Sequence, residues 1–169
     1  SMAMNTSRTP WTATLLAVLV SPGWASAEPG PDLRLVEVSP SVVMAQHASG
    51  SNVTCIALDD GLVFVDAGLS TEEAAAFRAQ MERRFERPTT RLILTHGHID
   101  HIFGMGAFAD VGVVAAAVER PLVEQQLAIE WNDDSIPVYE GIFPGFAKAQ
   151  QSARPFLPTE WIDGERSFG

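Results

Sequence analysis

Cysteine is almost absent from this sequence. The 169 residues contain one, Cys55, so an exported form of the chain would have no internal disulfide. Cys55 lies in the alternating segment SNVTCIAL, which favours a buried, unreactive thiol over a nucleophile. The stability of the folded chain must therefore come from an apolar core or from bound metal.

Positively charged residues are also scarce. Eleven Lys and Arg residues stand against 21 Asp and Glu residues, which gives a formal net charge of −10 with no basic stripe. Such a surface repels a phosphate backbone, so we expect no nucleic-acid partner. With 46% hydrophobic and 19% charged residues, the composition is that of a globular protein, and the length suits one domain or part of one.

The N-terminal segment lacks an apolar run long enough for a membrane-spanning helix. Its run WTATLLAVLV, residues 11–20, is about half of the roughly 20 residues that a bilayer requires, so an anchor is the weaker interpretation. Arg8 precedes the run and PGWASA follows it, which predicts a signal peptide over residues 1–27. We expect a mature domain over residues 28–169, located in the periplasm or secreted, with no stable membrane anchor after cleavage.

Alternating apolar residues predict strands in the first part of this domain. We expect one or two short strands over residues 33–47, broken at Pro40. Residues 51–58 and 62–68 flank the turn signal Asp59-Asp60-Gly61, which predicts a hairpin.

A capping box marks the start of a helix after this hairpin. Ser70 is followed three residues later by Glu73, and Phe77 begins an apolar repeat of four residues. These signals predict an amphipathic helix over residues 70–87 that Pro88 stops.

The rest of the chain alternates between strand and helix patterns. Residues 89–96 and 112–118 are continuous apolar runs, which are typical of strands covered on both faces, and a helix is predicted over residues 119–130. We expect residues 131–158 to form a long loop or lid and residues 160–168 a final hairpin. The fold class is therefore layered α/β.

Three of the four histidines lie within six residues, in the segment RLILTHGHIDH. Side chains two apart in an extended chain point the same way, so His96 and His98 should lie together at the end of a strand. The turn that follows should bring Asp100 and His101 into the same space. Imidazole nitrogen and carboxylate oxygen suit Zn²⁺, whereas calcium and magnesium prefer mostly oxygen ligands. Two zinc ions sharing a water would activate it for hydrolysis.

Two other sets of side chains allow a functional and a structural interpretation. His47 could line the mouth of a pocket, but a solvent-exposed loop histidine is the simpler interpretation. Four aromatic residues of the expected lid could form an apolar wall for a substrate or pack into the core, namely Trp131, Tyr139, Phe143 and Phe146.

The segment THGHIDH resembles the H-x-H-x-D-H signature of the metallo-β-lactamase superfamily, and the resemblance extends over residues 33–169. The family resemblance implies an αββα sandwich, of which this chain would be an N-terminal portion. It implies that His96 and His98 bind a first metal ion and that Asp100 and His101 bind a second. Asp66, in VDAG, matches an acidic position that supports the metal-binding loop without touching metal. Gly104 would fit a tight passage into the next helix.

The sequence departs from the family pattern after His101, because no histidine follows. The family completes its two metal sites with further histidines and an aspartate downstream, and two ligands do not make a stable zinc site. The chain could be a fragment, a degenerate relative, or dependent on a second chain. A fragment requires the fewest assumptions.

The resemblance implies an exported, zinc-dependent hydrolase of small molecules, with two Zn²⁺ ions per complete domain. A metal-bound hydroxide would attack an ester, thioester, lactone or lactam bond, and a periplasmic β-lactamase is one such enzyme. Asp100 would serve as the catalytic residue that orients the nucleophile as well as binding metal. The alternatives are a non-catalytic fragment or partner-binding domain, and a redox di-iron protein. The di-iron branch usually has Glu at the position of His98, which favours zinc.

Overall fold

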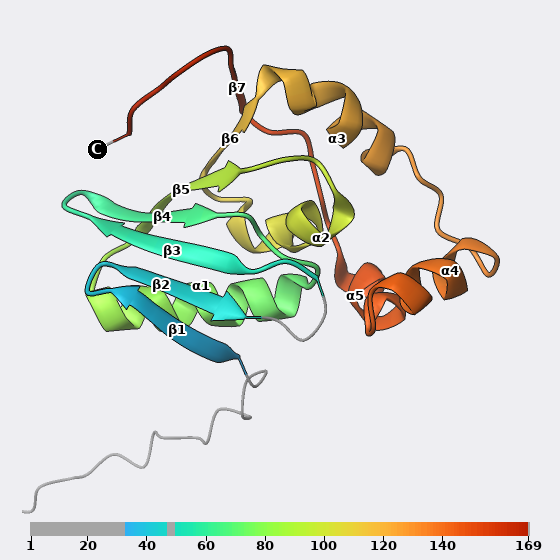
Figure 1. Ribbon diagram of the computed structural model, residues 1–169, viewed down its shortest axis with the longest axis horizontal. Helices are drawn as coiled ribbons and strands as arrows, with labels where there is room; N and C mark the ends of the chain where they lie inside the picture. The colour runs from blue at the N-terminus through green and yellow to red at the C-terminus, as the bar shows by residue number, and fades with distance from the viewer. Residues whose placement is uncertain (1–32, 47–49, 169) are drawn as a thin grey trace, which may run out of the picture.

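The computed structural model describes residues 33–46 and 50–168 (Figure 1). The predicted signal peptide, residues 1–27, and His47 lie outside these ranges, so both stay predictions. Within the described ranges, no helix is both long and apolar enough to cross a membrane.

The described residues form a seven-stranded mixed sheet whose strands follow one another in chain order (Figure 1). The first four strands are antiparallel, and the last four, beginning with the fourth, run parallel to one another. The strands are β1 (Arg34–Ser39), β2 (Val42–Gln46), β3 (Val53–Leu58), β4 (Gly61–Val65), β5 (Thr89–Leu94), β6 (Gly112–Ala116) and β7 (Glu160–Ile162).

Helices make the connections between the parallel strands, as the alternating pattern of the sequence predicted. The α-helices are α1 (Thr71–Phe85), α2 (Ile99–Ile102), α3 (Arg120–Leu127), α4 (Ser135–Ile142) and α5 (Phe146–Ser152). Two 3₁₀ helices, η1 (Phe103–Phe108) and η2 (Ala117–Glu119), adjoin α2 and α3. The expected α/β class is therefore confirmed.

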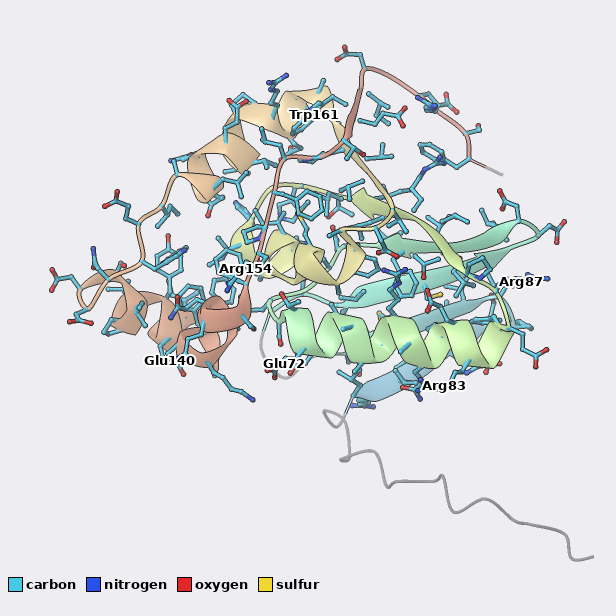
Figure 2. The ribbon with its side chains drawn as sticks, turned by 180° about the vertical axis from the view of Figure 1, so that it is seen from behind. Glu72, Arg83, Arg87, Glu140, Arg154 and Trp161 are labelled. Atoms are coloured by element: carbon cyan, nitrogen blue, oxygen red, sulfur yellow. The ribbon has the colours of Figure 1, made fainter. Side chains whose placement is uncertain are left out.

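Helix α1 follows the capping signal of the sequence. The Ser70 hydroxyl accepts a hydrogen bond from the backbone N–H of Glu73 at 3.3 Å, and Glu86 ends the helix in the left-handed conformation. Glu72 lies at one end and Arg83 at the other, an arrangement that suits the helix dipole (Figure 2). The predicted helix over residues 70–87 is confirmed, two residues shorter at its C-terminal end.

The core lies between α1, η1 and one face of the sheet. Phe64 of β4 contacts Phe77 of α1 edge-on at 5.5 Å between ring centroids and Phe108 of η1 at 5.1 Å. All three rings are fully buried. Burying an aromatic side chain of this size contributes about 1.5–3 kcal/mol.

The opposite face of the sheet is less completely covered than the sequence suggested. In β6, Val113, Val114 and Ala115 are all buried, which confirms coverage of both faces there. In β5, Leu92 is buried but the side chain of Ile93, which points to the other face, is half-buried. The prediction for residues 89–96 therefore holds for only one face of that strand.

The expected long loop over residues 131–158 is wrong in part, because α4 and α5 lie within it (Figure 1). The side-chain amide oxygen of Asn132 accepts hydrogen bonds from two backbone N–H groups, that of Asp134 at 3.0 Å and that of Ser135, the first residue of α4, at 2.9 Å. Pro137 occupies the first turn of α4, where a missing N–H costs little. Gly145, with φ of 91°, joins the two helices. The Pro and Gly residues therefore mark helix ends.

The expected final hairpin over residues 160–168 is also wrong. β7 pairs in parallel with β6, and no strand follows it within the described residues. The hydroxyl of Thr159 accepts a hydrogen bond from Val113 N–H at 2.9 Å and donates one to Val113 C=O at 3.1 Å. The Thr159 side chain thus extends the hydrogen-bond ladder between β6 and β7. The C-terminal segment therefore pairs with β6 and does not fold back on itself as a hairpin.

Candidate metal centre

The histidine motif begins where β5 ends, at the carboxyl edge of the parallel strands. Thr95 follows the strand directly, His96 and His98 lie in the loop, and Asp100 and His101 lie in α2. This edge is where open α/β sheets usually bind ligands.

The structure brings the four expected ligands together as two pairs. Nε2 of His96 lies 2.9 Å from Nδ1 of His98, and Nε2 of His101 lies 3.5 Å from Oδ2 of Asp100. The rings of His96 and His101 are 4.0 Å apart between centroids, so the two pairs adjoin. The division of these residues between two metal ions, which the family resemblance implied, stays a prediction.

The atom separations within each pair are those of a hydrogen bond, at 2.9 Å, and of an ion pair, at 3.5 Å. Two zinc ligands at tetrahedral angles, with Zn–N bonds of about 2.0–2.1 Å, are about 3.3 Å apart, so each pair would take up a zinc ion after a shift of a few tenths of an ångström. Within residues 33–46 and 50–168, no group of three such side chains is arranged to hold a metal ion. The described residues therefore supply two donor pairs, each of which needs further ligands.

Asp66 connects β4 to the motif. Its carboxylate accepts three hydrogen bonds, each 2.8 Å long, from Thr95 N–H, from the Thr95 hydroxyl and from Nδ1 of His101. The residue is 5% exposed and has a φ of 61°, which is uncommon for a residue other than glycine. Because the carboxylate accepts only, it holds a proton on Nδ1 of His101, and Nε2 faces Asp100.

The surroundings of His96 and His101 shift the pKa values of these two histidines in opposite directions. Burial alone would lower the pKa of His101, but the hydrogen bond and charge of Asp66, together with the charge of Asp100, raise it above the usual value. Burial lowers the pKa of His96, and the neighbouring His101 and His98 lower it further. The neutral form of His96, the form in which an imidazole can coordinate a metal ion, is therefore favoured.

A close backbone contact fixes the end of the motif against the segment that follows β4. Ala67 N–H donates to the carbonyl of His101 at 2.9 Å, and Gly104 N–H donates to the carbonyl of Gly68 at 2.9 Å. A Cβ atom on Gly104 would lie 1.9 Å from the carbonyl oxygen of Ala67. The tight passage expected at Gly104 is thus present, and it requires glycine.

Three further residues hold the motif without having been singled out in the sequence. Thr95 bridges Asp66 and the motif, Ser51 donates its hydroxyl to the carbonyl of Asp100 at 2.5 Å, and Glu119 accepts from Gly97 N–H at 3.1 Å. Only Thr95 carried a signal, since it directly precedes the first histidine. The other two come from distant segments that the fold brings together.

A recess of about 260 Å³ opens beside the motif. The motif forms one side, and residues of α3 and of α4 with its C-terminal end form the other. Its lining residues are His98, Ile99, Asp100, Gln126, Tyr139, Ile142 and Phe143. Two of the four aromatic residues considered as a substrate wall, Tyr139 and Phe143, lie in this lining, whereas Phe146 is buried in the core.

A family model for the metallo-beta-lactamase superfamily matches residues 48–167, which is more than half of the chain. The chain belongs to the metallo-beta-lactamase superfamily. The matched region contains the histidine motif, Asp66 and the recess.

Two curated relatives from Pseudomonas sp. match part of the chain. An (R)-specific secondary-alkylsulfatase is 31% identical over 94 residues, which cover 55% of this chain and 14% of the relative. A linear primary-alkylsulfatase is 31% identical over 83 residues, which cover 48% of this chain and 12% of the relative. The chain therefore spans a small part of each relative's length.

A solved structure shares the fold over most of the chain. A metallo-beta-lactamase from Pontibacter korlensis superposes with a TM-score of 0.58 and 16% sequence identity, covering 81% of this chain and 55% of that protein. At this identity the likeness shows the fold alone. It confirms the metallo-beta-lactamase-like architecture, of which this chain spans about half.

Proposed function

We propose that this chain supplies the metal-binding part of a zinc-dependent hydrolase that cleaves an ester, thioester, lactone or lactam bond of a small molecule. The observation that carries the proposal is the pairing of His96 with His98 and of Asp100 with His101, at separations that suit a shared cation. When bound, zinc supplies a Lewis acid and lowers the pKa of a coordinated water molecule.

The side chains of this chain contribute positioning and proton handling. Asp66 fixes the tautomer of His101, so that one nitrogen of His101 faces Asp100. The Asp100 carboxylate accepts a hydrogen bond from an attacking water molecule and orients its lone pair toward the scissile carbonyl. The hydroxyl of Thr95 contacts both Asp66 and Nδ1 of His96, which fixes the angle of the first histidine.

A sulfate ester is the second candidate substrate. Both Pseudomonas relatives are named as alkylsulfatases, and their similarity to this chain reaches 31% identity. A sulfate ester carries its negative charge next to the bond that is cleaved, and two cationic ions at the motif would attract that charge. This candidate uses the same residues as the first.

Zinc binding separates a hydrolase from a non-catalytic, partner-binding domain. Zinc titration of the whole protein that contains this chain, followed by the histidine ring signals in ¹H–¹⁵N NMR and by competition with a chelator, should show saturable binding. His98→Ala and Asp100→Asn should weaken binding at least tenfold, whereas Asp134→Asn, an exposed control, should not. A folded protein whose three variants all bind zinc like the parent would contradict the proposal, as would the absence of any zinc binding.

Activity assays on the same proteins identify the bond. We expect hydrolysis of p-nitrophenyl acetate, nitrocefin or p-nitrophenyl sulfate to require zinc and to fall at least 100-fold in Asp100→Asn. Preference for p-nitrophenyl sulfate would favour the second candidate over the first. Zinc binding without hydrolysis of any of these bonds, in the whole protein that contains this chain, would favour the non-catalytic alternative.

We also propose that the protein is exported, on the basis of the signal-peptide pattern in residues 1–27. Intact-mass analysis of protein expressed in a Gram-negative host should give a mature chain that begins at Glu28. Recovery of the uncleaved chain from the cytoplasm would contradict export and would leave the proposed chemistry unaffected.

A further inference from the structure

Gly97, the residue between the first two histidines, is held from outside the motif. Its backbone N–H donates a hydrogen bond to the Glu119 carboxylate at 3.1 Å. This N–H belongs to the planar peptide that joins His96 to Gly97, so the bond fixes the orientation of that peptide. A rotation of the peptide would change the direction in which the chain leaves His96, and with it the placement of His98. The Glu119 bond therefore acts on the relative position of the two rings.

Close packing explains why this position carries glycine. Gly97 is buried, and a Cβ atom there would lie 2.8 Å from Cγ2 of Val123 and 2.9 Å from the backbone nitrogen of the same residue. Val123 is fully buried within α3, so it cannot move aside. The lack of a side chain also leaves the backbone dihedral angles of Gly97 unusually free. Packing on α3 thus sets the distance of the loop, and a hydrogen bond is needed to set the orientation of its peptide.

The His98 side chain has little other support. The residue is exposed, and within residues 33–46 and 50–168 the one hydrogen bond of its ring is to Nε2 of His96, at 2.9 Å. His101, in contrast, is oriented by the buried carboxylate of Asp66. The placement of His98 therefore depends on the backbone that precedes it, where Glu119 acts.

Glu119 is placed for this contact by the parallel pairing of β5 with β6. Leu94 at the end of β5 pairs with Ala115 of β6, so both segments leave the sheet at the same edge. Glu119 follows β6 in η2 and is only partly exposed. The next residue, Arg120, pairs with Glu124 at 2.8 Å and not with Glu119. The Glu119 carboxylate is therefore directed to the loop and not to a surface ion pair.

We propose that Glu119 is a positioning residue for the His96–His98 pair: its carboxylate holds the Gly97 peptide so that the two rings stay adjacent. The benefit of this hold to metal binding rests on the proposed function. The hold itself does not, because the contacts that produce it involve only side chains and backbone of this chain.

Three substitutions of Glu119 separate its hydrogen bond from its charge. Glu119→Ala removes both. Glu119→Gln keeps an acceptor oxygen at the same reach without the charge, and Glu119→Asp keeps the charge one methylene short of Gly97. Because the proposal assigns the effect to the hydrogen bond, Glu119→Gln should behave almost like the parent and Glu119→Asp almost like Glu119→Ala. Glu124→Ala is the matched control, since it removes a carboxylate of the neighbouring helix that pairs with Arg120.

Hydrogen exchange and histidine NMR test the hold without zinc, in the whole protein that contains this chain. In Glu119→Ala and Glu119→Asp, exchange of the Gly97 amide should accelerate at least about tenfold, because the N–H loses its acceptor. The ring ¹⁵N signals of His98 should shift, whereas Nδ1 of His101, which Asp66 holds, should keep its signal. Amides inside β5 should exchange as in the parent. A substitution that only loosened the fold would instead accelerate exchange throughout β5.

Zinc affinity, measured by competition with a chelator, gives the consequence for metal binding. Loss of a contact that orients metal ligands typically lowers affinity about 10- to 100-fold. We expect a loss of about tenfold or more in Glu119→Ala and Glu119→Asp, and of less than about threefold in Glu119→Gln and Glu124→Ala.

The outcomes separate this inference from the proposed function. Unchanged Gly97 exchange and His98 ring signals in Glu119→Ala, or unchanged zinc affinity in that variant, would overturn the inference even where Asp100→Asn weakens zinc binding. A Glu119→Gln protein as impaired as Glu119→Ala would also overturn it, because the charge and not the hydrogen bond would then act. Faster Gly97 exchange and shifted His98 signals in a protein that binds no zinc would support the hold on the rings and count against the proposed function.

Discussion

Asp66→Asn should reverse the tautomer of His101. The Asp66 carboxylate accepts the Nδ1–H of His101 at 2.8 Å and so holds the proton on that nitrogen. An asparagine amide can present its NH₂ group at the same position, and Nδ1 would then have to accept. The proton would move to Nε2, the nitrogen that faces Asp100, and this nitrogen would no longer be free to bind metal.

The expected loss of stability in Asp66→Asn follows from the three hydrogen bonds that the carboxylate accepts. The bond from Thr95 N–H survives with the amide oxygen as acceptor, and the two bonds from the Thr95 hydroxyl and from His101 lose their charged acceptor. A hydrogen bond to a charged group contributes about 1.5–3 kcal/mol and a neutral one about 0.5–1.5 kcal/mol, so we expect a loss of about 2–3 kcal/mol. Zinc affinity should fall about 10- to 100-fold.

Two measurements check these values. Long-range ¹H–¹⁵N NMR distinguishes the protonated ring nitrogen of His101 directly, and urea unfolding at pH 7 gives the stability change. Glu86→Asn is the matched control, because Glu86 also has a positive φ, of 52°, yet lies at the end of α1 away from the motif. The control should change stability by less than about 0.5 kcal/mol. A proton that stays on Nδ1 in Asp66→Asn, with unchanged stability, would refute the reasoning.

Three further changes test the packing around the site and the core. Gly104→Ala places a Cβ atom 1.9 Å from a backbone carbonyl oxygen and should cost about 2–4 kcal/mol in urea unfolding, whereas Gly112→Ala, with nothing within 4 Å, should be nearly neutral; equal effects would contradict the close contact. Burial raises the pKa of Cys55 to about 12, so its thiol should resist Ellman's reagent until the protein unfolds, and rapid native-state labelling would show that it is accessible. Burial alone would raise the pKa of Glu82, but hydrogen bonds from the Thr89 hydroxyl and from an arginine of the same helix lower this pKa below its usual value of 4.5. The Glu82 carboxylate therefore stabilises the fold fully above pH 4.5, and this contribution is lost as the pH falls through the lowered pKa. Glu82→Gln should cost about 1 kcal/mol at pH 7 and flatten the acid limb of the stability profile, and a parallel profile would argue against this role.

The elements that sequence predicted well are those whose signals are local. The β3–β4 hairpin needed only alternation and the Asp59–Gly61 turn, and α1 needed only its cap at Ser70 and its apolar repeat. The predictions failed for α4 and α5, because their stability depends on tertiary contacts. Tyr139 of α4 and Phe146 of α5 both contact Trp131, which lies outside both helices. No local sequence pattern predicts such a cluster.

The candidate site likewise has one part that local sequence predicted and another that depends on the fold. The spacing of His96, His98, Asp100 and His101 identified the motif, because a strand end followed by a turn places these residues together with little help from the rest of the fold. The pairing of Asp66 with Thr95 and His101 depends on the register between β4 and β5, which is set by long-range packing. The recess depends on residues about 40 positions apart in the chain, so sequence could suggest its aromatic members but not their meeting with Asp100.

Backbone geometry adds an independent argument that the motif is a functional site. Within the described residues, Asp66 and Glu86 are the two non-glycine positions with positive φ, and at Glu86 the end of a helix explains it. No helix ends at Asp66, which nevertheless combines a left-handed backbone with a buried carboxylate, two features that each lower stability. Three hydrogen bonds offset them, and one of the three orients His101. This arrangement supports the proposed role of His101 as a metal ligand, because an acceptor that fixes the ring orients the coordinating nitrogen.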